Sequence, residues 1–312
     1  MFIGVKMKQK VTYIFLLLLT TGLISFYIEP ITTKISGLLR PDPAVVINKP
    51  NAHYRDVNFN FITQSKDFIP YSKQDLKNIF YSILNNGYEL FTFYCPSEYL
   101  DCIKDLNEIS ENQETLTHIN NFVHPFNSFE HIKATYREST GEVTIQVEHL
   151  YTNKEIAELS NKVDEILGKV IKGDMDDEAK ILAIHDYIIN NTKYDTQKLK
   201  DESPYHSNTA YGSLLEGYAL CSGYADAMAI FLNRLNVPNF KVSSSTHIWN
   251  VIYFNNTWLH LDLTWDDPVD ESEPAKNHLI YKFYLISTET LEDYKITEHG
   301  FDKTIYRELV SE

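Results

Sequence analysis

Three residues in the C-terminal half have the types and the order that catalysis by a thiol nucleophile requires. They are Cys221, His247 and Asp262. A cysteine attacks an acyl carbon as the thiolate, an adjacent imidazole takes up and returns the proton, and a carboxylate orients that imidazole and stabilises its charged form. We therefore interpret the three residues as a candidate nucleophile, base and base-orienter.

The segment around Cys221 predicts where the thiol lies. Small residues surround it in GYALCSGYADA, residues 217–227. An apolar stripe at helical spacing follows, formed by Tyr224, Met228, Phe231 and Leu235. Val-Pro at 237–238 ends that pattern. A helix beginning at Cys221 offers free N–H groups and the positive end of its dipole, which favour a thiolate and can hold an oxyanion. Tyr211 and Tyr218 are two further candidate donors to that oxyanion.

The spacing of the other two residues predicts that they share one face of a sheet. Strand-like segments at 247–254 and 257–264 flank Asn255-Asn256, a pair suited to a two-residue hairpin turn. Side chains alternate along a strand, so His247 and Asp262 become diagonal neighbours, with backbone-proximal atoms about 7–8 Å apart. A turn of odd length would send them to opposite faces.

Alternative readings exist for each of these residues. His260 shares the predicted face and is the rival base, and Cys221 taken alone could be an inert buried thiol. Asp262 interrupts an apolar strand, where a carboxylate needs a partner, and His247 is the one available. Trp265 is a candidate for the wall of the cleft.

Three segments around these residues together resemble the transglutaminase-like superfamily. They are Cys221-Ser222-Gly223-Tyr224-Ala225-Asp226-Ala227, Thr246-His247-Ile248-Trp249-Asn250-Val251 and Trp258-Leu259-His260-Leu261-Asp262-Leu263-Thr264-Trp265-Asp266. Residues 183–188, AIHDYI, resemble the helix that often precedes the core of that family. The resemblance covers about residues 155–290; one departure is Ile248, a position that is commonly Ala in the family.

The resemblance implies an α+β, papain-like core in which a cysteine-bearing helix packs on an antiparallel sheet. It implies that Cys221 is the nucleophile, His247 the base and Asp262 its partner, with a protein or peptide amide as substrate. An amine acceptor would give crosslinking, and water would give deamidation or peptide hydrolysis. The family also contains inactive members, so the alternative is an extracellular binding or scaffolding module.

Composition and motifs narrow the possible partners. The chain of 312 residues has 43 acidic against 28 basic residues and a net charge of −15, which argues against a nucleic-acid partner. No EF-hand loop, H-E-x-x-H motif or complete P-loop is present, so we expect neither a metal nor a cofactor. An acidic cluster that begins at the end of the third segment predicts a solvated loop, with a cation site as the alternative; its members are Asp266, Asp267, Asp270, Glu271 and Glu273.

The N-terminal region predicts a membrane anchor. Residues 11–28 carry no charge, and their length approaches the ~20 residues of a membrane-spanning helix. Three lysines within residues 1–10 favour a cytoplasmic tail and an extracellular remainder, whereas cleavage as a signal peptide would give a secreted protein. Residues 29–50, with four prolines, read as a linker. The sequence leaves two alternatives open for Cys95 and Cys102: they form a disulfide, or both remain free thiols.

Two folded regions are expected beyond the linker. Residues 51–152 predict a small α+β domain, and residues 153–312 predict the transglutaminase-like domain. Helices are expected at 72–84, 156–171 and 176–191. Strands are expected at 57–61, 88–94, 131–137, 142–149, 241–244, 247–254, 257–265 and 283–286.

Overall fold

The computed structural model describes residues 45–200, 202–269 and 279–310. The predicted tail, the predicted anchor at 11–28 and most of the predicted linker lie outside these ranges. Within them, no helix has the length and apolar character that crossing a membrane needs. Residues Ile47–Glu312 form one compact unit. The predicted boundary at residue 152 falls inside that unit, and the division into two domains stays a prediction.

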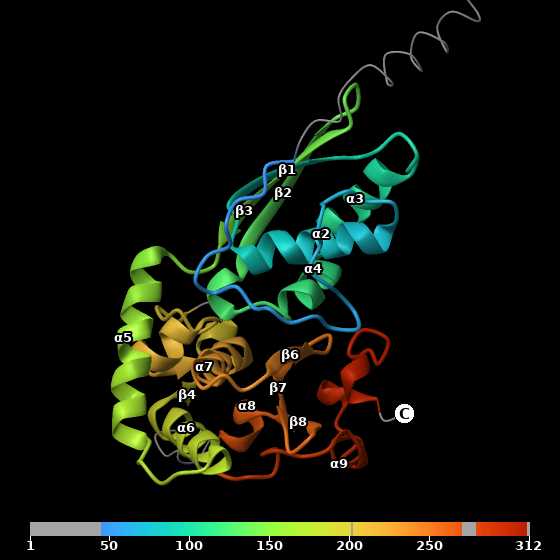
Figure 1. Ribbon diagram of the computed structural model, residues 1–312. Coiled ribbons are helices and arrows are strands. Elements are labelled where there is room, and N and C mark those ends of the chain that lie inside the picture. Colours follow the sequence, from blue (N-terminus) through green and yellow to red (C-terminus); the bar gives the residue numbers. More distant parts are fainter. Residues whose placement is uncertain (1–44, 201, 270–278, 311–312) are drawn as a thin grey trace, which may run out of the picture. The chain divides into compact units, whose positions relative to one another are not determined.

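The first part of this unit is a three-stranded antiparallel sheet with helices beside it (Figure 1). Its elements are α2 (Lys73–Asn86), β1 (Leu90–Tyr94), α3 (Cys102–Glu111), α4 (Gln113–Asn120), the 3-10 turn η1 (Pro125–Asn127), β2 (Phe129–Arg137) and β3 (Glu142–His149). The central strand β3 buries Val143, Ile145 and Val147 on one face, as the alternation of a strand requires. Ser72 caps α2 by accepting a hydrogen bond from Asp75 N, which confirms the predicted helix start.

The structure decides two points that concern this first part of the chain. The predicted strand at 57–61 is wrong: no strand forms there, and Phe59 packs against Phe122 and Phe240 at ring distances of 4.7 and 5.7 Å. The pairing of the two cysteines, left open by the sequence, is a disulfide that joins Cys95 to Cys102 at the start of α3.

The second part surrounds a buried helix, α7 (Cys221–Arg234). Before it come α5 (Asn153–Val170), α6 (Asp177–Asn191), β4 (Lys193–Tyr194), η2 (Lys198–Lys200), the π-helix η3 (Gly212–Glu216) and β5 (Tyr218–Ala219). After it come β6 (Asn239–Ser243), β7 (Ile248–Phe254), β8 (Thr257–Leu261), α8 (Leu263–Asp266), α9 (Thr288–Asp293), η4 (Thr297–His299) and η5 (Arg307–Leu309). Strands β6, β7 and β8 form an antiparallel sheet in that order, and α7 packs against β7 and β6 (Figure 1).

The hairpin between β7 and β8 has the predicted two-residue turn. Asn255 and Asn256 have φ angles of 50° and 62°, the left-handed values that such a turn demands. Phe254 therefore pairs with Thr257, as expected, and the register continues to Asn250 opposite Leu261.

The predicted strand 257–265 is too long, because β8 ends at Leu261. The side chain of Asp262 accepts the N–H groups of Thr264 and Trp265 and thereby starts α8. The predicted strand at 283–286 is also wrong: only an isolated bridge forms there, between Ile286 and His260.

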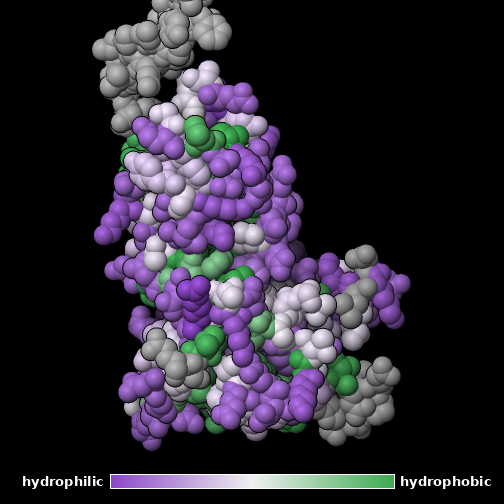
Figure 2. All heavy atoms as spheres, turned by 90° about the vertical axis from the view of Figure 1, so that its right-hand side faces the viewer, coloured by the Kyte–Doolittle hydropathy of each residue, from purple (hydrophilic) through white to green (hydrophobic). Residues whose placement is uncertain are grey.

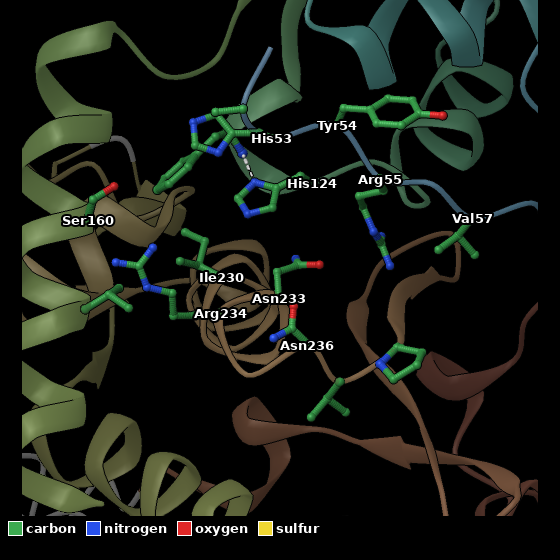
Figure 3. A pocket seen from close by; sticks show the side chains of 15 residues that line it. His53, Tyr54, Arg55, Val57, His124, Ser160, Ile230, Asn233, Arg234 and Asn236 are labelled. Carbon is green, nitrogen blue, oxygen red and sulfur yellow. Dashed lines mark hydrogen bonds between the residues drawn. The ribbon is translucent and has the colours of Figure 1, made fainter. Parts of the chain in front are cut away.

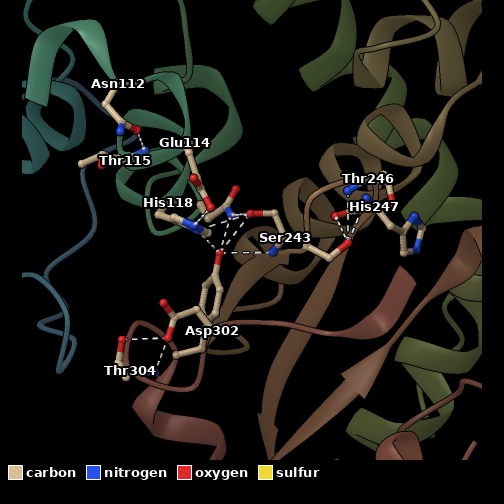
Figure 4. A network of polar contacts seen from close by, with 12 residues as sticks. Asn112, Glu114, Thr115, His118, Ser243, Thr246, His247, Asp302 and Thr304 are labelled. Carbon is tan, nitrogen blue, oxygen red and sulfur yellow. Dashed lines mark hydrogen bonds and ion pairs between the residues drawn. The ribbon is translucent and has the colours of Figure 1, made fainter. Parts of the chain in front are cut away.

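A buried polar network links α4 to the sheet and to the C-terminal segment (Figure 4). Tyr306 OH lies 2.9 Å from His118 Nδ1, accepts from Asn121 Nδ2 at 2.8 Å and accepts from Ser243 N at 3.1 Å. Because Ser243 is the last residue of β6, the network holds the end of this edge strand, from which the chain turns to His247 and β7. Hydrophilic side chains predominate on the face shown in Figure 2, where hydrophobic ones form only small groups.

Candidate active site

Cys221 is the first residue of α7, as the sequence predicts. Leu220, in an extended conformation, precedes it as the N-cap, and the Cys221 thiol is free and partly exposed. The first turn of α7 is tightly enclosed: a Cβ on Gly223 would lie 2.5 Å from Ser207 O and 2.9 Å from Thr209 O. The small residues near Cys221 therefore let the helix start approach the preceding loop.

His247 connects Cys221 to Asp262. It lies directly before β7, is buried, and stacks on Trp249 with 5.6 Å between ring centroids. Its Nε2 is 2.6 Å from Asp262 Oδ2, and the Cys221 side chain lies near enough to the ring to raise its pKa. Since Nε2 is engaged by Asp262, Nδ1 is the atom left for the thiol. The structure thus brings all three predicted residues together.

Asp262 is a fully buried carboxylate with four hydrogen-bond donors around it. Oδ1 accepts from Thr264 N at 3.0 Å and from Trp265 N at 3.3 Å. Oδ2 faces His247 Nε2 and, at 2.8 Å, His299 Nε2. A carboxylate bound on both oxygens cannot rotate, so it holds the His247 ring in one orientation.

The charges of this group favour a protonated imidazole. Burial disfavours the charged ring, but Asp262 and Cys221 outweigh burial and raise the pKa of His247 to about 10. Burial would also raise the pKa of Asp262, yet His247 and His299 lower it to about 2. At neutral pH the pair is therefore an imidazolium and a carboxylate.

His260, the rival base, is engaged elsewhere. Its Nδ1 accepts from Trp249 Nε1 at 2.9 Å, and its Nε2 is 3.0 Å from Thr288 Oγ1. Burial and the neighbouring His299 lower the pKa of His260 to about 3. Because the ring is neutral and both of its nitrogens make hydrogen bonds, we interpret His260 as a structural histidine and not as the base.

The three cleft candidates have different surroundings. Tyr211 OH donates to Glu158 on α5 at 3.0 Å, and Tyr218 stacks on Tyr205 with a centroid distance of 4.2 Å. Trp265 meets His247 edge to face at 6.4 Å, so it flanks the base as expected of a cleft wall.

Two neighbours of the site carry no signal in the sequence. His299 lies 37 residues beyond Asp262, in the short turn η4. Tyr194 pairs with Ala219 through the two-residue strands β4 and β5. Burial and the charge of Cys221 raise the pKa of Tyr194, which shows that its hydroxyl lies within electrostatic reach of the thiol.

One group among the described residues has the composition of a metal site: His247, Asp262 and His299, whose ligand atoms lie within 4.8 Å of one another. A metal-bound histidine normally donates its second ring N–H to an acceptor. His299 Nδ1 is buried and has no hydrogen-bond partner in the part of the chain that the structure describes. His299 Nε2 lies 2.8 Å from Asp262 Oδ2, and its other ring nitrogen lacks, within the described ranges, the acceptor that a metal-bound histidine has, so the residues do not fit a metal.

The prediction of a solvated acidic loop is wrong for its first two members. Asp266 is buried, with Oδ2 3.3 Å from His185 Nε2, and Asp267 accepts from Tyr224 OH at 2.6 Å. A buried carboxylate needs a hydrogen-bond partner. The partners of these two carboxylates lie on α6 and α7, so the contacts connect the α8 region to both helices. The other three acidic residues lie outside the described ranges.

Comparison with known proteins confirms the resemblance inferred from the sequence. Residues 164–263 match the transglutaminase-like superfamily, so the chain contains a transglutaminase-like domain. A solved structure described as a TGase aligns with a TM-score of 0.34 and 13% identity, over 46% of this chain and 46% of that one. A candidate cysteine protease from Cytophaga hutchinsonii aligns with a TM-score of 0.27 and 16% identity, over 44% of this chain and 62% of that one.

Both alignments span less than two-thirds of the other protein's chain. No curated protein matches the sequence.

Proposed function

We propose that this protein catalyses cysteine-dependent acyl transfer on protein or peptide amides, through an acyl-enzyme on Cys221. The observation that supports this most directly is the His247–Asp262 hydrogen bond of 2.6 Å, with the Cys221 side chain near enough to raise the pKa of His247. The position of Cys221 at the start of a 14-residue helix adds to it, because helix N-termini favour the negative charges of a thiolate and an oxyanion.

The first half-reaction follows from these positions. Cys221 Sγ attacks the amide carbonyl carbon, a C–S bond forms, and the carbonyl oxygen becomes an oxyanion. The first helical bond of α7 runs from Tyr224 N to Leu220 O, so the N–H groups of residues 221–223 stand before the helical ladder and can face that oxygen. His247 Nδ1–H then donates its proton to the leaving amine as the C–N bond breaks.

The second half-reaction returns the site to its starting state. An amine or a water molecule attacks the thioester carbonyl while His247 Nδ1 accepts its proton. The C–S bond breaks, Cys221 leaves as the thiolate, and His247 is again protonated. An amine acceptor yields a crosslink; water yields deamidation of a glutamine side chain or hydrolysis of a peptide bond.

Two experiments test the proposal. Iodoacetamide should label Cys221 well below pH 8, with Cys221→Ala as the control that abolishes labelling, since the other cysteines form a disulfide. A glutamine-containing peptide and an amine-tagged probe, read by mass, should then show a crosslink or a cleavage. Labelling only at high pH, with no product of either kind, would leave an inactive binding or scaffolding domain as the function.

We also propose that the chain is membrane-anchored through residues 11–28, with its catalytic part outside the cell. The uncharged run after three lysines supports the anchor. The Cys95–Cys102 disulfide supports an oxidising compartment. Cell fractionation tests this: the protein should stay with membranes after alkaline carbonate washing, whereas recovery in the medium would indicate a cleaved signal peptide.

A further inference from the structure

A hollow of about 410 Å³ lies between the segment that precedes α2, helix α5 and the C-terminal end of α7 (Figure 3). Its lining from α7 consists of Ile230, Asn233 and Arg234. Cys221 is at the other end of this 14-residue helix, which is about 20 Å long. The hollow is therefore separate from the candidate active site.

The lining of the hollow differs in charge from the rest of the protein. It includes two arginines, Arg55 and Arg234, and two histidines, His53 and His124, but no Asp or Glu. The whole chain, by contrast, has 43 acidic and 28 basic residues. The described residues that line the hollow thus contribute no carboxylate of their own, although Asp164 pairs with the lining residue Arg234.

The two arginines are not equivalent. Arg234 is neutralised by Asp164, which accepts from its Nε at 3.0 Å. Arg55 instead donates to main-chain carbonyls, those of Phe122 at 3.0 Å and of Asn239. Burial lowers the pKa of Arg55 to about 10, and only Tyr81 acts against that shift. Arg55 is thus a partly buried guanidinium without a carboxylate partner among the described residues.

His124 adds a hydrogen-bond donor beside this cation. Its Nδ1 accepts from Phe126 N at 3.1 Å, so the proton of the neutral ring is on Nε2. Burial, His53, Arg55 and Lys241 hold the pKa of His124 well below its usual value, which keeps the ring neutral at pH 7. His53 stacks on His124 with 5.0 Å between centroids. In Figure 3 the His124 ring points into the hollow above Ile230.

We propose that this hollow binds a small anion, through a carboxylate or phosphate group held by the Arg55 guanidinium and His124 Nε2–H. A partly buried charge is stabilised when an opposite charge completes its contacts, and the N–H groups of Arg55 not used by the carbonyls of Phe122 and Asn239 can donate to an oxyanion. The site is independent of the proposed acyl transfer, since no step of that reaction involves its residues.

Calorimetric titration of the full chain tests the proposal, with sodium phosphate and sodium benzoate as probes and sodium chloride of equal ionic strength as reference. We expect saturable binding of one anion per chain and a rise in melting temperature with its concentration. Binding of phosphate alone or benzoate alone distinguishes the two groups. Absence of saturable binding by either probe overturns the proposal.

A matched pair of variants separates charge from shape. Ser160 lines the hollow from α5 (Figure 3), so Ser160→Glu adds a carboxylate there and Ser160→Gln adds a side chain of similar size without charge. We expect at least tenfold weaker binding in S160E and a change of less than about threefold in S160Q. Equal binding by the two variants would contradict the site. Arg55→Gln should also abolish binding; if that variant does not fold, the Ser160 pair still decides.

Discussion

His247 and Asp262 are joined by a hydrogen bond of 2.6 Å between Nε2 and Oδ2, although 15 residues separate them in the sequence. The hairpin turn at Asn255-Asn256 brings them to one side, and the caps of α8 hold the carboxylate in place. The bond directs Nδ1 of the ring toward the start of α7. Substitution of Asp262 tests this relationship between the two residues.

Asp262→Asn should reduce Cys221-dependent turnover by about 10³–10⁴-fold, because an amide neither fixes the productive tautomer nor stabilises the imidazolium. The pKa of His247, raised to about 10 chiefly by Asp262 against burial, should fall. The rate of iodoacetamide labelling as a function of pH measures this: labelling at pH 6 should slow strongly in D262N. Unchanged labelling would show that Asp262 does not act through His247.

His299 should act as a positioning residue through Asp262. His299→Phe removes one hydrogen bond to a charged group, worth about 1.5–3 kcal/mol, and should lower the labelling rate about 10- to 100-fold. His299→Gln keeps a donor and should recover part of that rate. The pH at which labelling is half-maximal should also move in H299F. If H299F and H299Q lose stability alike and keep the wild-type pH profile, His299 has only a packing role.

Gly223 should be intolerant of a side chain. Gly223→Ala places Cβ within 3.0 Å of two carbonyl oxygens and so must displace the helix start that carries Cys221. We expect slower Cys221 labelling and a loss of stability of roughly 1–3 kcal/mol. Gly168→Ala in α5 is the matched control, because nothing lies within 4 Å of its added Cβ. That variant should gain about 0.5–1 kcal/mol. Urea unfolding measures both.

Stability should fall at alkaline pH because of His247. A group whose pKa is raised from 6.5 to about 10 stabilises the fold fully below pH 6.5, and this contribution is lost as the pH rises through about 10. The free energy of unfolding of the wild type should therefore decline between these values, whereas that of His247→Gln should stay flatter. The pKa of Asp262 is lowered from 3.8 to about 2, so its effect has the opposite sign. Asp262 stabilises the fold fully above pH 3.8, and this stabilisation is lost as the pH falls through about 2. Parallel pH curves for wild type and H247Q would refute the assignment.

Local chemistry determined the helices α2, α5, α6 and α7 and the β7–β8 hairpin. Apolar residues at helical spacing predicted α7 and its start at Cys221, and two asparagines predicted the turn that sets the register. Both depend on interactions between residues near one another in the chain. That register brings the residues before β7 and after β8 together, and the cap of α8 then fixes the Asp262 side chain.

Distant packing decided the rest. His299 meets Asp262, Tyr211 turns to Glu158, and Phe59 abandons its apparent strand for Phe122 and Phe240. Asp266, which looks solvated in the sequence, is buried against His185. Partners so far apart leave no period or turn signal, since whether a polar side chain is solvated or paired depends on which surfaces the complete fold brings against it. The sequence by itself therefore determined the order and facing of the candidate catalytic residues, and only the tertiary structure decided what surrounds and orients them.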